Sequence, residues 1–264
     1  MVDADILLRE GDVDGARAAL IARAKASPAD AATRMFLFQL FAVTGEWDKA
    51  RAQLDMLVRL SPGAQMLAVA YGQAITAERQ RAAALAGAAP VPVLARAGGW
   101  IDDLAAALGR RDEGDAETLR DRALDAAPDM PGVIEADGMA PVSFDWIADA
   151  DAWFGPAVEA IIAGTWGLLP FDAVEWIKSA GARDLRDTIW YPVEIGLTGG
   201  RAVAALLPAR YPGSETACEA RLRLAGATDW TASGHGVGQH LLATSAGTEV
   251  GLMAIRRISF ATRA

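Results

Sequence analysis

The sequence is short of cysteine, histidine and basic residues. Its 264 residues include one cysteine, Cys218, and two histidines, His235 and His240. A single cysteine excludes an intrachain disulfide and is typical of a reducing compartment. The formal net charge of −9 argues against nucleic acid as a partner, because proteins that bind nucleic acid usually carry a basic patch or stripe.

Long hydrophobic runs are missing as well. No window reaches the roughly 18 uninterrupted apolar residues that a membrane helix needs. The first ten residues carry acids where a signal peptide carries bases, and no apolar segment follows them. We therefore expect a cytoplasmic protein without a membrane segment. With 52% apolar and 22% charged residues, the composition is that of folded domains rather than of a disordered chain.

The strongest pattern in the sequence is a segment that occurs twice. Seven residues recur at one fixed offset (45 − 11 = 34): Gly11, Ala16, Arg17, Ala18, Leu20, Ser27 and Pro28 return as Gly45, Ala50, Arg51, Ala52, Leu54, Ser61 and Pro62. A period of 34 residues is that of one tetratricopeptide helix–turn–helix unit. Such units stack on their neighbours and leave a concave surface where another protein can lie. The repeat predicts an interaction protein.

Helical spacing continues beyond the second unit. It predicts helices over residues 65–86, 99–109 and 115–127. Pro128 follows Pro62 by 66 residues, which is close to two periods. This spacing predicts a degenerate unit that caps the array.

An acidic stretch lies near the middle of the chain. Residues 110–151 contain twelve Asp or Glu and four Arg. A run of this kind is usually a solvated face or an acidic linker. The other interpretation is a surface that steers a partner carrying basic residues.

The pattern changes after Gly138. Helical spacing predicts one more helix over residues 149–164, after which the apolar period becomes two. Two predicted hairpins turn at residues 198–200 and 245–248, where glycines permit tight turns. The predicted fold class is α+β. A tetratricopeptide-like helical domain spans residues 1–137, and an α+β domain with a small antiparallel sheet spans residues 138–264.

Groups that could carry catalysis are few. Cys218 could act as a nucleophile with His235 as its base if a loop brought them together, and this enzyme stays the alternative to an interaction protein. Asp229 is a third candidate, although its carboxylate could simply cap the Trp230 indole. Residues 234–239, GHGVGQ, lack the strand, helix and lysine of a nucleotide-binding loop. The sequence therefore predicts no catalytic residue, no metal and no cofactor.

Five stretches carry a resemblance to a known family. They are LLREGD at residues 7–12, FDWIADAD at 144–151, DLRDTIW at 184–190, ALLPARYPGSE at 205–215 and GVGQ at 236–239. With them the chain resembles the ImpE/TagJ (SciE-type) accessory proteins of bacterial type VI secretion systems. The chain departs from the family pattern at His240, where we expect a basic residue.

The resemblance implies a non-enzymatic adaptor. Members of this family are associated with the contractile sheath of the secretion system and bind an N-terminal helix of its small subunit, TssB. Some are thought to influence sheath disassembly by the ClpV ATPase. No catalytic residues come with the resemblance. A scaffold with an unrelated protein partner remains a further alternative.

Five residues are predicted to contact the partner. We expect an amphipathic helix to lie in a groove of the array, with large aromatic residues supplying most of the affinity. Trp47 and Trp100 are the aromatic candidates, and Arg210, Tyr211 and Glu215 form a polar loop that could join them. The alternatives are burial in the core for each tryptophan and a structural corner for the loop.

Overall fold

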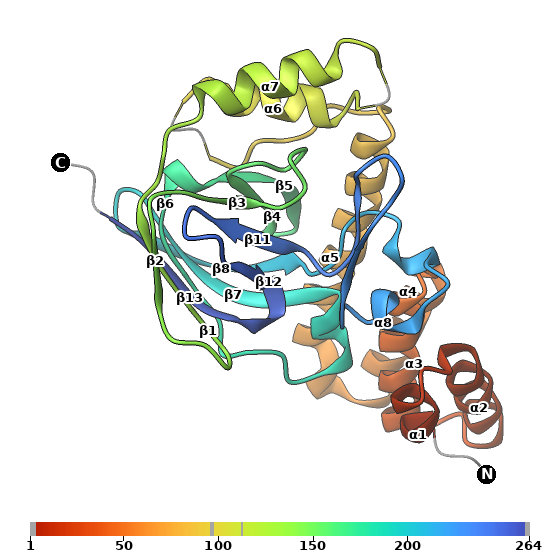
Figure 1. Cartoon of the computed structure of the whole chain (residues 1–264). Coiled ribbons are helices and arrows are strands. Elements are labelled where there is room, and N and C mark those ends of the chain that lie inside the picture. The colour runs from red at the N-terminus through yellow and green to blue at the C-terminus, as the bar shows by residue number, and fades with distance from the viewer. Residues whose placement is uncertain (1–3, 96–97, 112, 262–264) are drawn as a thin grey trace.

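The computed structural model describes residues 4–95, 98–111 and 113–261. Helices α1 to α5 stand beside a large sheet, and α6 and α7 lie over it (Figure 1). The helices are α1 (Ala4–Arg9), α2 (Val13–Ala26), α3 (Ala31–Val43), α4 (Trp47–Leu60), α5 (Gln65–Leu85), α6 (Trp100–Leu108), α7 (Ala116–Ala126) and α8 (Ala220–Arg223). No helix among the described residues is both long enough and apolar enough to cross a membrane.

The two predicted repeat units are pairs of antiparallel helices, α1–α2 and α3–α4. Gly11 and Gly45 make the turns with φ of 83° and 68°, a conformation that glycine adopts without strain. The repeated Leu20 and Leu54 are 2% and 0% exposed. Equivalent positions of the two units thus occupy equivalent places in the core.

Most strands join one antiparallel sheet, which holds eight strands within the described residues. In spatial order they are β2 (Val142–Phe144), β1 (Gly132–Ala136), β13 (Ile255–Phe260), β6 (Val174–Lys178), β7 (Trp190–Leu197), β8 (Arg201–Pro208), β4 (Ala157–Ile162) and β5 (Thr165–Pro170). Strands β7 and β8 form the predicted hairpin around residues 198–200. The α+β fold class is confirmed, with a larger sheet than expected.

Two smaller sheets complete the fold. Strand β11 (Leu241–Thr244) pairs with β12 (Glu249–Gly251) in the second predicted hairpin and with β3 (Ile147–Asp149) on its other side. Strands β9 (Thr228–Trp230) and β10 (Gly236–Gly238) form a separate ribbon. The ribbon is held to the loop after β8, where the Tyr211 backbone amide donates a hydrogen bond of 2.8 Å to the carbonyl oxygen of Gly238.

The predicted helix over residues 149–164 is wrong. This segment contains the end of β3, a turn with Gly155 at φ 55°, and strand β4. Strand β4 is paired on both sides and buried along almost its whole length. A strand buried on both faces has no polar side, so its apolar residues do not alternate, and the apolar spacing resembles that of a helix.

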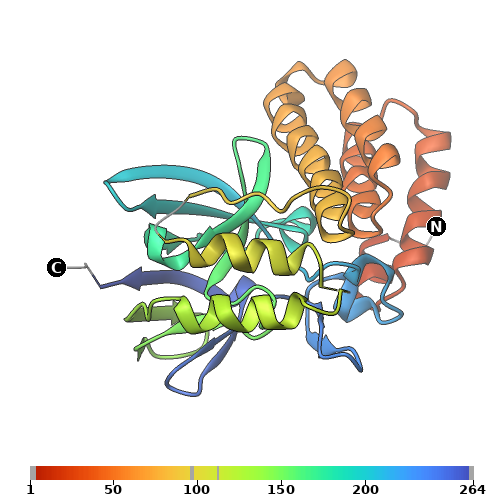
Figure 2. The ribbon, with the colours of Figure 1, turned by 90° about the horizontal axis from the view of Figure 1, so that it is seen from above.

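Helices α6 and α7 do not stack on the repeat array as a third unit. They lie side by side across the sheet (Figure 2). Arg120 of α7 covers the ring of Trp153 at 4.8 Å, and the Trp100 indole at the start of α6 donates a hydrogen bond to Asp172. Strand β1 precedes residue 138 and pairs with β2 and β13. The division into domains at that residue stays a prediction.

We predict that the two repeat units are equally sensitive to a lost leucine. Leu20→Ala and Leu54→Ala each leave a cavity in the core and should lower the free energy of unfolding by about 2–5 kcal/mol. Met66→Ala is the control, because Met66 is 79% exposed and its loss should change stability by less than about 0.5 kcal/mol. Urea unfolding measures all three. A Leu54→Ala variant as stable as the wild type would contradict the stacked array.

Candidate functional site at the junction of helices and sheet

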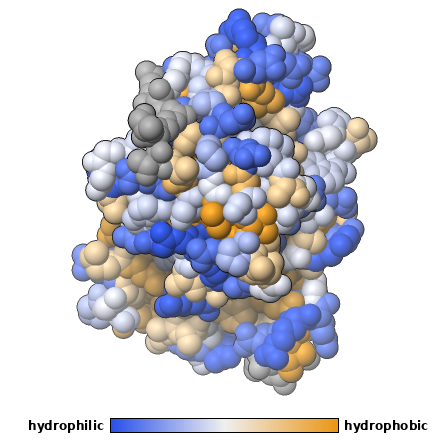
Figure 3. Space-filling model, turned by 60° about the vertical axis from the view of Figure 1, so that its left-hand side comes forward, coloured by the Kyte–Doolittle hydropathy of each residue, from blue (hydrophilic) through white to orange (hydrophobic). Residues whose placement is uncertain are grey.

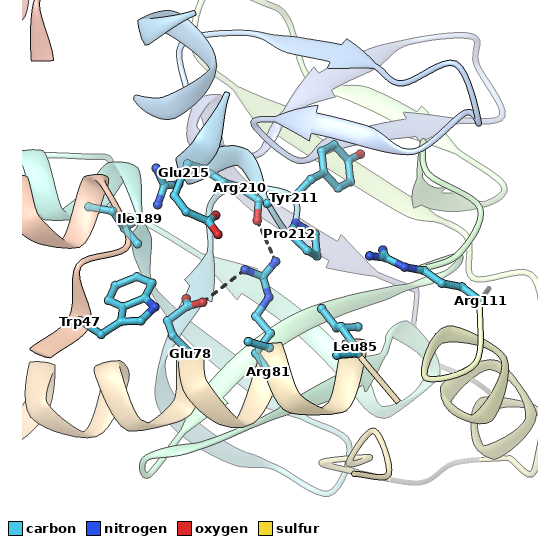
Figure 4. A pocket seen from close by; sticks show the side chains of 13 residues that line it. Trp47, Glu78, Arg81, Leu85, Arg111, Ile189, Arg210, Tyr211, Pro212 and Glu215 are labelled. Atoms are coloured by element: carbon cyan, nitrogen blue, oxygen red, sulfur yellow. Dashed lines mark hydrogen bonds and ion pairs between the residues drawn. The ribbon is translucent and has the colours of Figure 1, made fainter. Parts of the chain in front are cut away.

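A cavity of about 360 Å³ lies where the repeat array meets the sheet. The start of α4, one side of α5 and the loop that follows β8 line it (Figure 4). The lining includes Trp47, Arg210, Tyr211 and Glu215, four of the five residues predicted to contact a partner. Trp100 lies elsewhere, buried at the start of α6.

The four lining residues differ in what they offer a partner. Trp47 is half-buried and packs against the core ring of Trp190 at 5.9 Å. Arg210 is buried and donates hydrogen bonds to the carbonyl oxygens of Val43 and Arg223. Tyr211 is buried, and its hydroxyl donates to Asp149 at 2.6 Å. Arg210 and Tyr211 therefore form the floor of the cavity, with their polar groups bonded within the chain.

A buried ion pair between Arg81, which also lines the cavity, and Glu159 lies next to these residues. Arg81 of α5 donates two hydrogen bonds, of 2.7 and 2.6 Å, to the two carboxylate oxygens of Glu159 on β4. A third, of 2.8 Å, goes to the carbonyl oxygen of Arg210. Both charged side chains are under one-tenth exposed. This is a bidentate pair, in which two parallel charge-assisted hydrogen bonds join the guanidinium to the carboxylate, and such pairs are among the strongest hydrogen-bonded interactions in proteins.

The charges of this pair stabilise each other. Burial disfavours charge on Arg81, but the carboxylates of Glu159 and Glu78 outweigh burial and raise the pKa of the guanidinium. Burial also disfavours charge on Glu159, yet Arg81 and His240 outweigh it and lower the pKa of Glu159 to about 2. The Trp166 indole donates a further hydrogen bond to Glu159 at 2.9 Å. Both members of the pair are thus ionised at neutral pH.

His240 extends the network to a second carboxylate. Its Nδ1 lies 2.6 Å from Asp149 and its Nε2 lies 3.1 Å from Glu159. Burial disfavours the imidazolium, but Asp149 and Glu159 outweigh burial and raise the pKa of His240 to about 9. Both ring nitrogens then donate hydrogen bonds at neutral pH. His240 supplies a positive charge at the position where the family resemblance leads us to expect a basic residue.

Glu78 completes the network on the side of the array. It accepts a hydrogen bond of 3.0 Å from the Trp190 indole and faces Arg81 at 3.4 Å. Burial raises the pKa of Glu78, and burial lowers the pKa of Arg210 to about 10. Helix α5 thus presents an acid and a base, one helical turn apart, to the same buried junction.

Two charged groups of the cavity remain open to a partner. Within the described part of the chain, the side chains of Arg111 and Glu215 have no hydrogen bond or ion pair, although the charge of Glu215 acts on Arg81 and Arg210 from a distance. Both are partly exposed and lie on different sides of the cavity (Figure 4). The open groups are therefore one cation, one anion and the ring of Trp47.

The alternative catalytic pair is not assembled. Cys218 is an exposed thiol before α8, whereas the ring of His235 lies against Trp153 at 6.1 Å. No contact joins Cys218 to His235 in the described residues, and no group of three or more His, Cys, Asp or Glu within them could hold a metal ion. Asp229 accepts a hydrogen bond of 2.8 Å from the backbone amide of Trp230, and within the described residues no bond joins its carboxylate to the indole nitrogen.

Sequence reasoning missed the buried charges. No role is predicted from the sequence for Glu78, Arg81 or Glu159, whereas Asp149 falls in an acidic stretch, at the start of a predicted helix and in one stretch of the family resemblance. The available signal was a charged residue inside an apolar run, as in AVEAII at residues 157–162. A charge in such a run is buried only with a partner, and the partner of Glu159 is 78 residues away in the sequence.

Fold and site together define the class of protein: a tetratricopeptide array locked to an antiparallel sheet by buried charges, with a cavity at the junction. The sequence model of the ImpE protein family matches residues 142–259, and a tetratricopeptide repeat model matches residues 7–70. The chain is 40% identical to the type VI secretion system accessory component TagJ of Pseudomonas aeruginosa over 260 residues, which cover 97% of this chain and 90% of that protein. The chain belongs to the ImpE/TagJ family.

A solved structure has the same fold. The crystal structure of protein VPA1032 from Vibrio parahaemolyticus matches with a TM-score of 0.85, 98% coverage of both chains and 20% sequence identity. The arrangement of array and sheet is therefore shared by a protein with a very different sequence.

We predict that His240 makes stability depend on pH. Its folded pKa is raised from 6.5 to about 9, so its contribution is fully present below pH 6.5 and is lost as the pH rises through about 9. The loss is on the order of 3 kcal/mol, since each tenfold change in proton affinity is worth about 1.4 kcal/mol. Urea unfolding between pH 6 and about 9.5 measures it.

Two variants make this test specific. His240→Gln should flatten the pH dependence above pH 6.5, whereas His235→Gln, the same change at the other histidine, should leave it as in the wild type. Equal slopes for the wild type and His240→Gln would contradict a protonated His240 in the buried network.

Proposed function

We propose that this protein is a non-enzymatic adaptor of a bacterial type VI secretion system, working in the cytoplasm and binding an amphipathic helix of another protein. The observation that carries the proposal is the 40% identity to TagJ over 97% of the chain. The repeat array supports it, because tetratricopeptide units present surfaces to protein partners. The partner we propose is the N-terminal helix of the small sheath subunit.

The cavity is the place where we propose that the helix is held. Its volume of about 360 Å³ is near the lower end of the ~300–1,000 Å³ typical of ligand pockets. It suits one or two anchoring side chains of a helix that lies across its mouth. Trp47 offers an aromatic surface of the kind that dominates binding energy at interfaces. The open charges of Glu215 and Arg111 orient a helix that carries a base and an acid on its flanks.

Rigidity of the site supports this mode of binding. The cavity floor is fixed by the bonds of Arg81, Arg210 and Tyr211, so binding orders few groups of this protein. A preformed site loses less affinity to the ordering of side chains and loops. Through the bound helix, the adaptor could modulate sheath assembly or disassembly.

The enzyme alternative has no specific support. The exposed Cys218 and the ring of His235 make no contact with each other in the described residues. Replacing both, as Cys218→Ser with His235→Gln, should leave binding of the sheath helix unchanged. If the double variant lost its function in the secretion system while binding the helix normally, the adaptor proposal would be overturned.

We predict that Trp47 anchors the partner helix. Trp47→Ala should weaken binding of a synthetic N-terminal helix of the small sheath subunit at least tenfold, about 1.4 kcal/mol or more. Trp146→Ala is the matched control, since Trp146 is 42% exposed and lies before β3, outside the cavity lining. Isothermal titration calorimetry with the full chain measures the affinities, and unfolding curves verify that both variants fold.

Two results would contradict the proposal at different levels. If the peptide does not bind the wild-type protein, the proposed sheath partner is wrong. If Trp47→Ala binds normally while a change at Met66 or Val69, which are exposed on α5, weakens binding, the partner is right and the cavity is the wrong place.

A further inference from the structure

A second recess, of about 520 Å³, lies at the far end of the sheet from the repeat array. It is formed by the start of β6, the end of β13 and the turn after β7. We propose that this recess binds the guanidinium group of an arginine side chain, with Asp172 as its buried acceptor. This inference goes beyond the adaptor function and uses none of the residues of the first cavity.

Asp172 is the reason for the proposal. It is only 4% exposed and lines the recess. Its Oδ2 accepts a hydrogen bond of 3.2 Å from the Trp100 indole, whereas its buried Oδ1 has no hydrogen-bond partner among the described residues. Leaving a buried polar atom unpaired destabilises the protein, and more so when the group is charged. A donor that enters the recess would satisfy Oδ1 and remove this destabilisation.

The walls of the recess suit a flat group. Trp176 packs over Gly196, where even a methyl group would lie 2.3 Å from the ring, and the ammonium of Lys178 already lies over the Trp176 ring, 4.1 Å from its centroid. Phe260 is held against Phe171 at 5.3 Å. A guanidinium is planar and weakly hydrated, and it stacks on aromatic rings while its N–H groups donate in its own plane. The end of β13 faces the side of the molecule that Figure 3 brings forward, where small apolar patches lie among hydrophilic residues.

The buried charge of the recess favours a cation. Asp172 is its buried acid, and Glu175 is an exposed acid of the lining. Two cations lie nearby: Arg257, whose Nε donates a hydrogen bond of 2.7 Å to the Ser259 hydroxyl, and Lys178, whose ammonium lies over the Trp176 ring. An anion would meet the unpaired Oδ1 and be repelled. The two acids also fall short of a metal site, since no group of three or more His, Cys, Asp or Glu in the described chain could hold an ion.

The test uses the full chain and two probes of nearly identical shape. N-acetyl-arginine methylamide should bind with a dissociation constant of about 1 mM, as expected of one charge-assisted anchor. The citrulline analogue replaces the guanidinium by a neutral urea and should bind at least tenfold more weakly. Shifts of the tryptophan indole signals in NMR titrations report both affinities and show whether Trp176 and Trp100 are affected.

Three variants assign the binding to the recess. Asp172→Asn keeps an acceptor for Trp100 and removes the charge, so it should weaken binding of the arginine probe at least tenfold. Glu175→Gln should weaken it about threefold, because a partly solvated charge contributes less. Arg257→Gln removes a repelling charge of the lining and should tighten binding. Glu175→Gln and Arg257→Gln leave the Asp172–Trp100 bond intact, so they remain informative if Asp172→Asn does not fold.

The proposal is overturned if the citrulline probe binds as tightly as the arginine probe, or if neither binds at 50 mM. It is also overturned if folded Asp172→Asn binds as the wild type does. Agmatine, a free alkyl guanidinium, identifies the source of the group. Tighter binding of the arginine peptide assigns the recess to a protein partner, and tighter binding of agmatine assigns it to a small molecule, with the same dependence on Asp172 in either case.

Discussion

The ion pair between Arg81 and Glu159 is the contact on which the arrangement of the molecule depends. It joins α5, the last helix of the array, to β4, the second strand from one edge of the sheet, with both groups under one-tenth exposed. Charges removed from water are tolerated only when nearly all their bonding groups are used. Here Glu159 accepts from Arg81, Trp166 and His240. A small rotation of the array against the sheet would break the bonds from Arg81 to Glu159 and to the Arg210 carbonyl oxygen, and the bond from Trp190 to Glu78. These bonds therefore fix the orientation of the array relative to the sheet.

This fixed junction explains where the cavity lies. Its floor consists of residues whose polar groups are already committed, such as Arg210, which reaches from the loop after β8 to the carbonyl oxygen of Val43 at the end of α3. Its rim carries the half-buried Trp47 and two charged side chains, Arg111 and Glu215, that form no hydrogen bond or ion pair within the described chain. The array alone would supply only the helical part of this surface. The cavity is therefore a property of array and sheet together.

The sequence predicted features that depend on neighbours along the chain and failed where distant contacts decide. The repeat units, α5 and both hairpins follow from local spacing and from turn glycines such as Gly11 and Gly45, and they are confirmed. Strand β4 was predicted as a helix because its burial between β8 and β5 removes the alternation that identifies a strand. The site was predicted in part, since Trp47 and Glu215 lie at the cavity. Its buried charges were not predicted, because each is paired with a residue far away in the sequence, as Arg81 is with Glu159 at a separation of 78 residues.

The two tryptophans that sequence reasoning treated alike have different environments. Trp47 begins α4 with part of its ring open at the cavity, so it can contact a partner without any rearrangement. Trp100 begins α6 almost fully buried, and its indole N–H is bonded to Asp172. Because this bond uses Oδ2 of Asp172 and leaves its buried Oδ1 without a partner in the described residues, Trp100 positions an acceptor rather than making a contact itself. The residue type alone does not distinguish these two roles. They depend on whether the ring is open to solvent and on whether its N–H group is already hydrogen-bonded in the fold.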